Sequence, residues 1–327
     1  MEKKILCFYE YPYVKDLYQA NFDKKIWFLK GAVQDYKKNK RFEEVEILSV
    51  FIDSILDQKN IDKFPNLKFI ITRSTGTDHI DLSYAKRKKI EVINIPDYGS
   101  DSVAEYAIAL LLTLSKKIIL ANEEVKSSKD FSTSGIHEIE GFELKDKKIG
   151  IIGTGRIGKK MALLSKGLGL DISLFDKFPD EKFAKKNKME YLDLENILEN
   201  SDILSFHLPL IKETKNFISK KEFKKMKDGV VLVNTSRGEI LKTKDLFEFL
   251  KNGKIALAGF DVLAEEECLG REHHKIKCNS EIKKINKKII KMKNVIVTPH
   301  NAFNTKEATK RRVLMSLDEI KKFSLHN

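Results

Sequence analysis

A glycine-rich turn between a strand pattern and a helix pattern is the feature that most limits how this chain can fold. Residues 148–152 contain three isoleucines around one glycine, which is typical of a short buried strand. Between this run and a segment with apolar residues at helical spacing lies the turn Gly153-Thr154-Gly155-Arg156-Ile157-Gly158. Such glycines permit a tight turn, a close approach of the backbone to a pyrophosphate, and close packing of the helix on the strand. We therefore predict a nucleotide-binding α/β domain here.

An acidic residue follows the second strand of this unit. Residues 172–175 predict a strand that ends at Asp176, 18 residues after Gly158. A carboxylate at this place can accept hydrogen bonds from a ribose diol and repels a 2′-phosphate, so the sequence predicts NAD rather than NADP. The alternative is a glycine turn without a ligand, because this short motif also occurs by chance.

Length and cysteine usage indicate a cytoplasmic protein of two domains. The 327 residues can bury two cores, and no apolar segment is long enough for a membrane span or a signal peptide. The three cysteines, Cys7, Cys268 and Cys278, form no CxxC motif. We therefore expect no disulfide framework and a reducing compartment.

The basic charge does not by itself predict a nucleic-acid partner. The formal charge of +13 comes from 61 basic and 48 acidic residues, and the lysines are spread over polar helix-like segments such as 182–188 and 220–227. No basic arm or nucleic-acid motif is present, so we expect a solvated surface that modestly attracts small anions, with no nucleic-acid or membrane partner.

The first hundred residues predict a small parallel α/β unit. Apolar runs predict strands at 5–9, 45–51, 69–72 and 91–95, and a helical segment is expected at 24–37. Ser102 and Glu105 fit a capping box that opens a helix reaching about residue 125. The segment after His300 looks helical and too short for a domain, so we expect it to return to the first one. The predicted domains are 1–100 with 301–327, and 101–300.

Polar residues follow three predicted strands of the second domain. Strands are expected at 202–207, 230–234, 255–260 and 295–298, and Arg237, Glu266 and His300 come after the last three. Ligands bind at the carboxyl ends of strands in open α/β sheets. A guanidinium there can bind a carboxylate through two hydrogen bonds, and an imidazole can act as general acid and base. The sequence predicts that a cation, an acid and a histidine meet at this edge.

Several motifs in order resemble the D-isomer-specific 2-hydroxyacid dehydrogenase family, from Thr72 to Glu307. They are the 153–158 turn, Ser-Phe-His-Leu-Pro-Leu at 205–210, Asn-Thr-Ser-Arg-Gly at 234–238, the spacing from Asp261 to Glu266, and Thr-Pro-His at 298–300. Tyr98, Ala302-Phe303 and the long segment before His300 resemble the D-lactate dehydrogenase branch. The chain departs from that branch at 99–102, where Asp101 adds a negative charge. The resemblance implies a Rossmann NAD-binding domain and a smaller flavodoxin-like substrate domain, both doubly wound parallel sheets.

The resemblance also implies roles for individual residues. Arg237 binds the substrate carboxylate and 2-oxo oxygen, helped by backbone N–H groups of Thr75 and Gly76. His300 gives a proton to the carbonyl oxygen, and Glu266 holds the other ring nitrogen. Tyr98 and Phe303 line the side-chain pocket. The residues expected at the cofactor are Val103, Gly153, Gly155, Arg156, Ile157, Gly158, Asp176, His207, Pro209, Thr235 and Asp261.

Two further clusters have alternative interpretations. His207 could be a second active-site histidine, although the resemblance places it on the cofactor side. Cys268, His273, His274 and Cys278 can all be zinc ligands, but their spacing fits no closed site, so no metal is predicted. The Lys-rich stretch 272–293 reads as a flexible surface insertion.

The expected function is NADH-dependent reduction of a small 2-oxo acid, pyruvate first, to the D-2-hydroxy acid. Alternatives are a dehydrogenase for hydroxyisocaproate, glycerate or phosphoglycerate, and an NADH-sensing binding protein of the same fold. The resemblance implies a homodimer joined through the cofactor domain, with the 103–125 helix as a candidate interface element.

Overall fold

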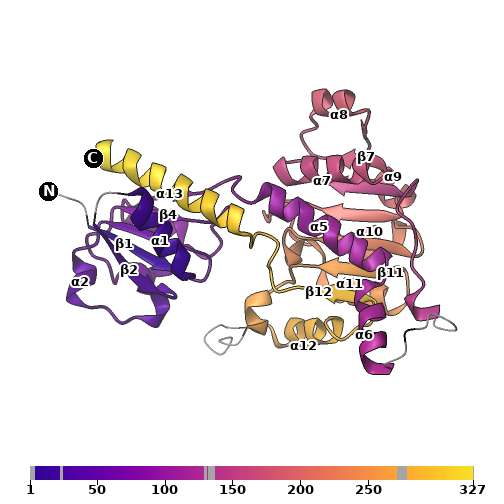
Figure 1. The fold of residues 1–327 in the computed structure, drawn as a ribbon, viewed down its shortest axis with the longest axis horizontal. Helices are drawn as coiled ribbons and strands as arrows, with labels where there is room; N and C mark the ends of the chain where they lie inside the picture. The colour runs from indigo at the N-terminus through magenta and orange to yellow at the C-terminus, as the bar shows by residue number, and fades with distance from the viewer. Residues whose placement is uncertain (1–3, 23–24, 129–130, 132–136, 271–277, 327) are drawn as a thin grey trace. The chain divides into compact units, whose positions relative to one another are not determined.

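The chain divides into two compact units in the computed structural model, which describes residues 4–22, 25–128, 131, 137–270 and 278–326 (Figure 1). One unit comprises Met1–Gly99 and Asn304–Asn327, and the other comprises Ser100–Phe303. Of the described helices, none is long and apolar enough to cross a membrane.

The described strands of the first unit form one parallel sheet in the order β2-β1-β3-β4-β5. This is the flavodoxin-like order, in which the strands after β2 are added on the other side of β1. The elements of this unit are β1 (Ile5–Tyr9), α1 (Pro12–Asn21), β2 (Ile26–Lys30), η1 (Val33–Asp35), α2 (Lys40–Glu43), β3 (Ile47–Val50), α3 (Gln58–Ile61), β4 (Phe69–Thr72), α4 (Leu82–Arg87), β5 (Glu91–Asn94) and α13 (Lys306–His326).

The C-terminal helix α13 completes the first unit, beside α1 (Figure 1). The Tyr18 hydroxyl of α1 lies 2.6 Å from Ser316 Oγ of α13. On the sheet side, the Phe323 ring stacks on Phe69 of β4, with ring centroids 4.3 Å apart. The helical character expected for this segment is therefore confirmed.

The helix expected at 24–37 is wrong. Ile26–Lys30 is the edge strand β2, which pairs in parallel with β1 from Ile5 and Ile26 onward, and residue 24 lies outside the described residues. The sequence Ile-Trp-Phe-Leu favours a strand because β-branched and aromatic side chains pack well on a pleated sheet. The pairing with β1, which local spacing does not reveal, decides between the two states.

The second unit is built on a parallel sheet in the order β12-β11-β10-β9-β6-β7-β8. Its direction reverses between β6 and β9, as in a Rossmann sheet. The elements are α5 (Ser100–Ser115), α6 (Ile118–Ser128), η2 (His137–Ile139), β6 (Lys148–Ile152), α7 (Arg156–Gly167), β7 (Asp171–Phe175), α8 (Glu181–Asn187), β8 (Glu190–Tyr191), α9 (Leu194–Asn200), β9 (Ile203–Phe206), α10 (Lys220–Lys225), β10 (Val230–Asn234), η3 (Gly238–Ile240), α11 (Thr243–Lys251), β11 (Ile255–Phe260), η4 (Glu266–Leu269), α12 (Ser280–Ile289) and β12 (Val295–Val297).

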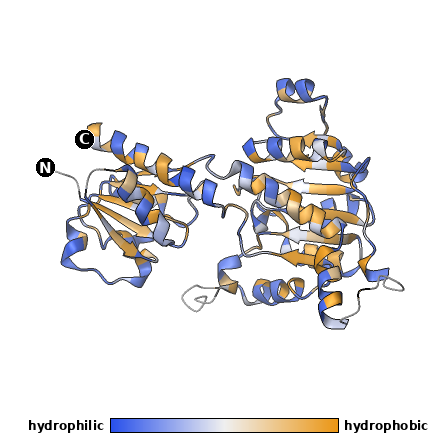
Figure 2. Ribbon diagram, in the orientation of Figure 1, coloured by the Kyte–Doolittle hydropathy of each residue, from blue (hydrophilic) through white to orange (hydrophobic). Residues whose placement is uncertain are grey.

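Alternate residues of these strands form two cores, one on each face of the sheet. Val231 and Val233 of β10 join the core beneath α5 and α7, whereas Leu232 joins the core beneath α9, α10 and α11. Successive side chains of a strand point to opposite faces, so a strand covered on both faces is apolar throughout. The strands of the sheet are accordingly mostly coloured as hydrophobic in Figure 2.

The long helix expected after Ser102 differs from the structure at both ends. α5 begins at Ser100, and Ser102 Oγ donates a hydrogen bond to Ala302 O at 2.6 Å instead of forming the predicted capping box. α5 ends at Ser115, and Lys117 has a φ of 53°, which separates α5 from α6. A left-handed residue turns the chain, so the two segments are separate helices.

The expectation of no disulfide is also wrong, because Cys268 and Cys278 are bonded to each other. Cys7 remains a free, buried thiol. The disulfide joins η4 to the residues just before α12, two segments that the sequence does not show to be neighbours. It removes one argument for a reducing compartment. The two histidines considered above as zinc ligands, His273 and His274, lie outside the described residues.

The Lys-rich stretch 272–293 contains a packed helix rather than only a flexible insertion. Residues 272–277 lie outside the described residues, but α12 packs against α11 and buries Asn286 and Ile289. Lys284, Lys287 and Lys288 of α12 are exposed, whereas Lys283 is half-buried.

Candidate active site

The glycine turn after β6 has a backbone that side chains would obstruct. Gly153 has a φ of +93°, and a Cβ there would lie 2.8 Å from the backbone of His207. A Cβ on Gly158 would lie 1.9 Å from Gly153 O, so the first turn of α7 sits directly on this loop. Beside Gly155, in contrast, a Cβ would meet no atom within 4 Å. The turn therefore closes tightly on itself and leaves one side open at the N-terminus of α7, as a pyrophosphate requires.

Asp176 lies at this turn. Its carboxylate accepts hydrogen bonds from Thr154 N at 2.6 Å and from Thr154 Oγ1 at 3.2 Å, and the other oxygen accepts one from Phe178 N at 2.9 Å. The acidic side chain is thus fixed where the loop of β6 meets the end of β7. This position is the one expected for an acid that recognises a ribose.

Two buried polar atoms near the same sheet edge have no hydrogen-bond partner among the described residues: His207 Nδ1, after β9, and Thr235 Oγ1, after β10. His207 Nε2 lies 2.9 Å from Ser205 Oγ. Burial lowers the pKa of His207 to about 4, so the ring is neutral and unsuited to donate a proton as a second catalytic acid. Orphaned polar atoms beside the open turn are suited to contact a polar ligand. Pro209 is exposed, and Val103 and Ile157 are half-buried.

Arg237 follows β10 at the carboxyl edge of the sheet. Its backbone carbonyl accepts a hydrogen bond from Asn234 Nδ2 at 3.0 Å, and its guanidinium donates one to Ser236 O at 2.8 Å. A Cβ on the next residue, Gly238, would lie 2.0 Å from Leu263 C. Only glycine therefore allows the Arg237 loop to approach the segment that leads to Glu266.

His300 and Glu266 form a pair. His300 Nδ1 lies 2.5 Å from Glu266 Oε1, and Leu263 N donates to Glu266 Oε2 at 3.1 Å. His300 has a φ of 50°, and its own N–H donates to Asp261 O at 2.8 Å. The structure thus brings together the acid and the histidine that the sequence placed after two different strands.

The electrostatics of the pair favour a charged imidazole. Burial opposes the charge, but the hydrogen bond to Glu266 and its negative charge outweigh this effect and raise the pKa of His300. Arg237 opposes the rise and Asp261 supports it, so both groups lie close enough to act on the ring. A histidine with a raised pKa is protonated over a wider pH range and can serve as an acid.

The Asp261 carboxylate anchors the segment that carries His300. Oδ1 accepts hydrogen bonds from Thr298 Oγ1 at 2.6 Å and from Asn301 N at 2.8 Å, and Oδ2 accepts one from Ala302 N at 2.8 Å. Burial raises the pKa of Asp261, partly offset by these hydrogen bonds. The family resemblance linked Asp261 to the cofactor but did not predict this anchoring, because no spacing rule connects residues so far apart.

The first unit holds its candidate residues in a loop fixed by a buried ion pair. Arg73 donates to Glu10 Oε2 at 2.8 Å and to Phe8 O at 2.6 Å. In the following loop, Thr75 O accepts a hydrogen bond from Asn94 Nδ2 at 2.7 Å, and Ser74 Oγ donates to Gly76 O at 2.7 Å. The loop backbone is therefore held in one conformation within this unit.

The two aromatic candidates lie in different units. Tyr98 is buried, and the Arg312 guanidinium lies 5.9 Å from its ring centroid within the first unit. In the second unit, the Phe303 ring packs edge-on against the His300 ring, with centroids 6.0 Å apart. Asp101, the departure noted above, forms an ion pair with Lys160, so its charge is compensated.

Comparisons with known proteins address the whole chain. The family model "D-isomer specific 2-hydroxyacid dehydrogenase, NAD binding domain" matches residues 108–302. The chain belongs to the D-isomer-specific 2-hydroxyacid dehydrogenase family. A glyoxylate reductase of Thermococcus litoralis is 35% identical over 82% of this chain and 77% of its own length, and a D-lactate dehydrogenase of Escherichia coli is 36% identical over 74% and 71%.

A solved family structure is similar over both units. The D-lactate dehydrogenase of Aquifex aeolicus, complexed with NAD and lactic acid, is 33% identical and covers 98% of this chain and 95% of its own, with a TM-score of 0.86. The predicted α/β fold with two parallel sheets is therefore confirmed. The cofactor is NAD, in agreement with the family domain and with the open glycine turn.

Proposed function

We propose that the chain reduces a small 2-oxo acid, with pyruvate as the preferred substrate and D-lactate as the product. The observation that carries this proposal is the His300–Glu266 pair at 2.5 Å, at the sheet edge that also holds Arg237 and the cofactor turn. A proton donor with a raised pKa beside a guanidinium suits a reaction in which a carboxylate must be bound and a carbonyl oxygen protonated.

In the proposed reaction, Arg237 binds the substrate carboxylate through two parallel hydrogen bonds and polarises the neighbouring carbonyl. Glu266 occupies Nδ1 of His300, so Nε2 is the nitrogen that donates its proton to the carbonyl oxygen. Reduced NAD, when bound, supplies the hydride that C2 of the substrate accepts. The negative charge of Glu266 stabilises the imidazolium until the proton has moved and holds the ring in one orientation.

The preference for pyruvate rests on the family relatives. Their names include glyoxylate reductase, hydroxypyruvate reductase, aromatic 2-oxoacid reductase and D-lactate dehydrogenase, so the shared part of the substrate is the 2-oxo acid group. The Aquifex aeolicus structure that matches nearly the whole chain holds lactic acid. We propose that Phe303 and Tyr98 contact the substrate side chain, and that Thr75 and Gly76 N–H groups assist Arg237. An apolar wall discriminates weakly, since one methylene changes binding by about 1 to 3 kcal/mol.

The test is oxidation of NADH by the purified protein with pyruvate, glyoxylate, hydroxypyruvate, 2-oxobutyrate, 2-oxoisocaproate, phenylpyruvate and phosphohydroxypyruvate. The largest kcat/KM with pyruvate, and a product that a D-specific assay recognises as D-lactate, would support the proposal. A larger value with another acid would replace pyruvate by that acid. Tight NADH binding without turnover of any of them would contradict the enzyme and favour the sensing protein.

We also propose a homodimer joined through the second unit. Three apolar side chains of α6 are exposed, Ile118 at 52%, Ile119 at 40% and Val125 at 39%, and none of the described residues of α6 is buried. Contiguous exposed apolar side chains mark association surfaces, and Ile118 and Ile119 are adjacent in the chain. Light scattering of the eluting protein checks this proposal: a mass of twice 37.7 kDa is expected, and 37.7 kDa alone would contradict it.

A further inference from the structure

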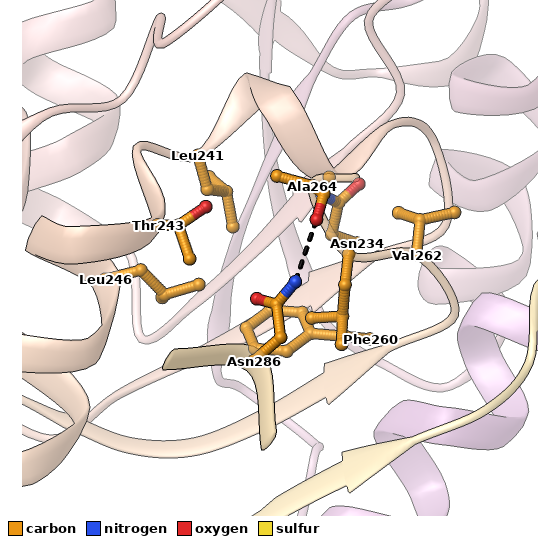
Figure 3. Close-up of a pocket in the computed structure, with 10 residues that line it drawn as sticks. Asn234, Leu241, Thr243, Leu246, Phe260, Val262, Ala264 and Asn286 are labelled. Carbon is orange, nitrogen blue, oxygen red and sulfur yellow. Dashed lines mark hydrogen bonds between the residues drawn. The ribbon is translucent and has the colours of Figure 1, made fainter. Parts of the chain in front are cut away.

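A buried asparagine of α12 contacts the segment that carries Glu266. Asn286 is 0% exposed, and its Nδ2 donates a hydrogen bond to Ala264 O at 2.8 Å (Figure 3). Ala264 precedes Glu266 by two residues, and Leu263, just before it, donates its N–H to Glu266 Oε2. The Asn286 amide therefore acts on the short stretch of backbone that places the Glu266 carboxylate.

The same stretch is held from the other side by the Arg237 loop. The Leu263–Ala264 peptide lies so close to Gly238 that a Cβ there would meet Ala264 N at 2.1 Å. Ala264 is thus confined on its N–H side by the residue after Arg237 and on its carbonyl side by the amide of Asn286. Loss of the amide contact therefore frees Ala264 on its carbonyl side only, which is the side that leads to Glu266.

The surroundings of Asn286 are unfavourable for an amide that made no specific contact. The side chain faces a cavity of about 10 Å³, whose lining includes Leu241, Leu246 and Phe260 (Figure 3). Its Oδ1 has no partner in the described part of the chain. Burial of a polar group without a full set of hydrogen bonds costs free energy, and an apolar residue of similar size would avoid that cost. The one contact that only a donor can make is the bond to Ala264 O.

We propose that Asn286 is a positioning residue of the active site, which fixes the carbonyl group of Ala264 and thereby the distance between Glu266 and His300. This inference rests on the proposed function of the pair. It assigns α12, a helix in the Lys-rich stretch, an indirect effect on the proton-donating histidine through Ala264 and Glu266, because the Asn286 side chain touches neither substrate nor cofactor in the proposed reaction.

The charged groups that act on His300 come from three elements: Glu266 from η4, Asp261 from the end of β11, and Arg237 from the loop after β10. Asn286 acts only on the first of these through the peptide it holds. A change at Asn286 should therefore alter the contribution of Glu266 and leave the contributions of Asp261 and Arg237 in place. That selectivity distinguishes positioning from a general loss of structure.

The test compares Asn286→Leu with Ile289→Val. Leucine removes the donor and keeps the branching and the number of side-chain heavy atoms, whereas the control removes a methyl from another fully buried residue of α12 and keeps the bond to Ala264. Asn286→Ala is the second variant if Asn286→Leu does not fold. The first measurement is the pH titration of the His300 ring by NMR without substrate, with His300→Ala used to assign its signal among the seven histidines.

We expect Asn286→Leu to lower the pKa of His300 and to reduce kcat/KM about tenfold, while Ile289→Val leaves both near the wild type. In the Glu266→Gln background the same substitution should change kcat/KM less than about twofold, because the group it acts through has lost its charge. An unchanged titration of His300, or an equal loss in both backgrounds, would overturn the inference. If no 2-oxo acid is reduced but the titration still shifts, the proposed function fails and the positioning stands.

Discussion

His300 Nδ1 and Glu266 Oε1 lie 2.5 Å apart across 34 residues of sequence. The histidine sits in a left-handed backbone conformation after β12, and the glutamate opens η4 after β11. The neighbouring parallel strands β11 and β12 end at the same edge of the sheet. Residues that follow these strand ends can therefore meet although they are distant in the sequence. The pair is the most consequential contact of the second unit because it sets the charge state of the histidine.

Substitution of Glu266 by glutamine should move the pH dependence of reduction. In the proposed reaction the protonated ring is the active form, and the Glu266 charge raises its pKa, so activity should be lost as pH rises through that pKa. Without the charge the pKa falls, and the limb on the alkaline side moves to lower pH. We expect kcat to fall about a hundredfold. A kcat profile from pH 5 to 10 checks this, and a limb that does not move would remove Glu266 as the partner.

His300→Ala should abolish turnover without loss of the cofactor. A general acid contributes roughly 10² to 10⁴-fold to rate. We expect NADH binding to depend instead on the glycine turn after β6, which His300 does not form. We expect kcat to fall at least about a hundredfold and the NADH Kd, measured by fluorescence, to change less than about twofold. Loss of both turnover and NADH binding would indicate misfolding, and normal turnover would show that another residue donates the proton.

Arg237→Lys keeps the charge and removes the planar pair of donors. We expect KM for the 2-oxo acid to rise and kcat/KM to fall about a hundredfold, because an ammonium cannot make two parallel hydrogen bonds to one carboxylate. NADH binding serves as the control and should be unaffected. A kcat/KM within about twofold of the wild type would show that Arg237 does not bind the substrate.

Asp176 should decide between NADH and NADPH. Its carboxylate lies at the cofactor turn, bonded to Thr154 N, where its charge opposes a 2′-phosphate. Asp176→Ser is expected to raise the kcat/KM ratio of NADPH to NADH by about tenfold or more. The matched control is Asp171→Asn, an exposed carboxylate at the start of the same strand, β7. Equal ratios in the wild type and in Asp176→Ser would remove Asp176 from cofactor selection.

Reduction of the Cys268–Cys278 disulfide should lower stability. The bond closes a span of 10 residues, for which restriction of the unfolded chain contributes about 2 to 3 kcal/mol. A reductant should therefore lower the free energy of unfolding, measured in urea, by that amount. It should also raise the number of titratable thiols. The variant with serine at both positions should show no response to reductant. A wild-type protein that titrates three thiols without reductant would contradict the disulfide.

The sequence was most informative where the signal is local. The strand, turn and helix around Gly153 to Gly158 follow from glycine spacing and apolar runs, because a backbone that must approach itself within van der Waals distance excludes side chains. The strands that precede Arg237, Glu266 and His300 follow from apolar runs that are covered on both faces of the sheet. Those three residues could be named from the ends of these runs.

Local patterns failed where a partner elsewhere in the chain decides the outcome. The apolar residues in 26–30 are compatible with a strand and with part of a helix. Pairing with β1 selects the strand. Lys117 turns the chain between two helices that the pattern joined. The disulfide depends on the approach of η4 to the start of α12, which no cysteine spacing reveals.

The sequence by itself determined the fold class, the cofactor turn and the types of residue available for chemistry, because each depends on a short stretch of chain with its own backbone and burial requirements. Only the tertiary structure decided how those residues act on one another. It shows the hydrogen bonds of the Asp261 carboxylate to the segment that carries His300, the 2.5 Å contact between His300 Nδ1 and Glu266 Oε1, and the hydrogen bond from the Asn286 amide to Ala264 O. Such contacts join residues far apart in the chain, and their geometry is set by how helices and strands pack. The spacing of residues along the sequence does not reveal this packing.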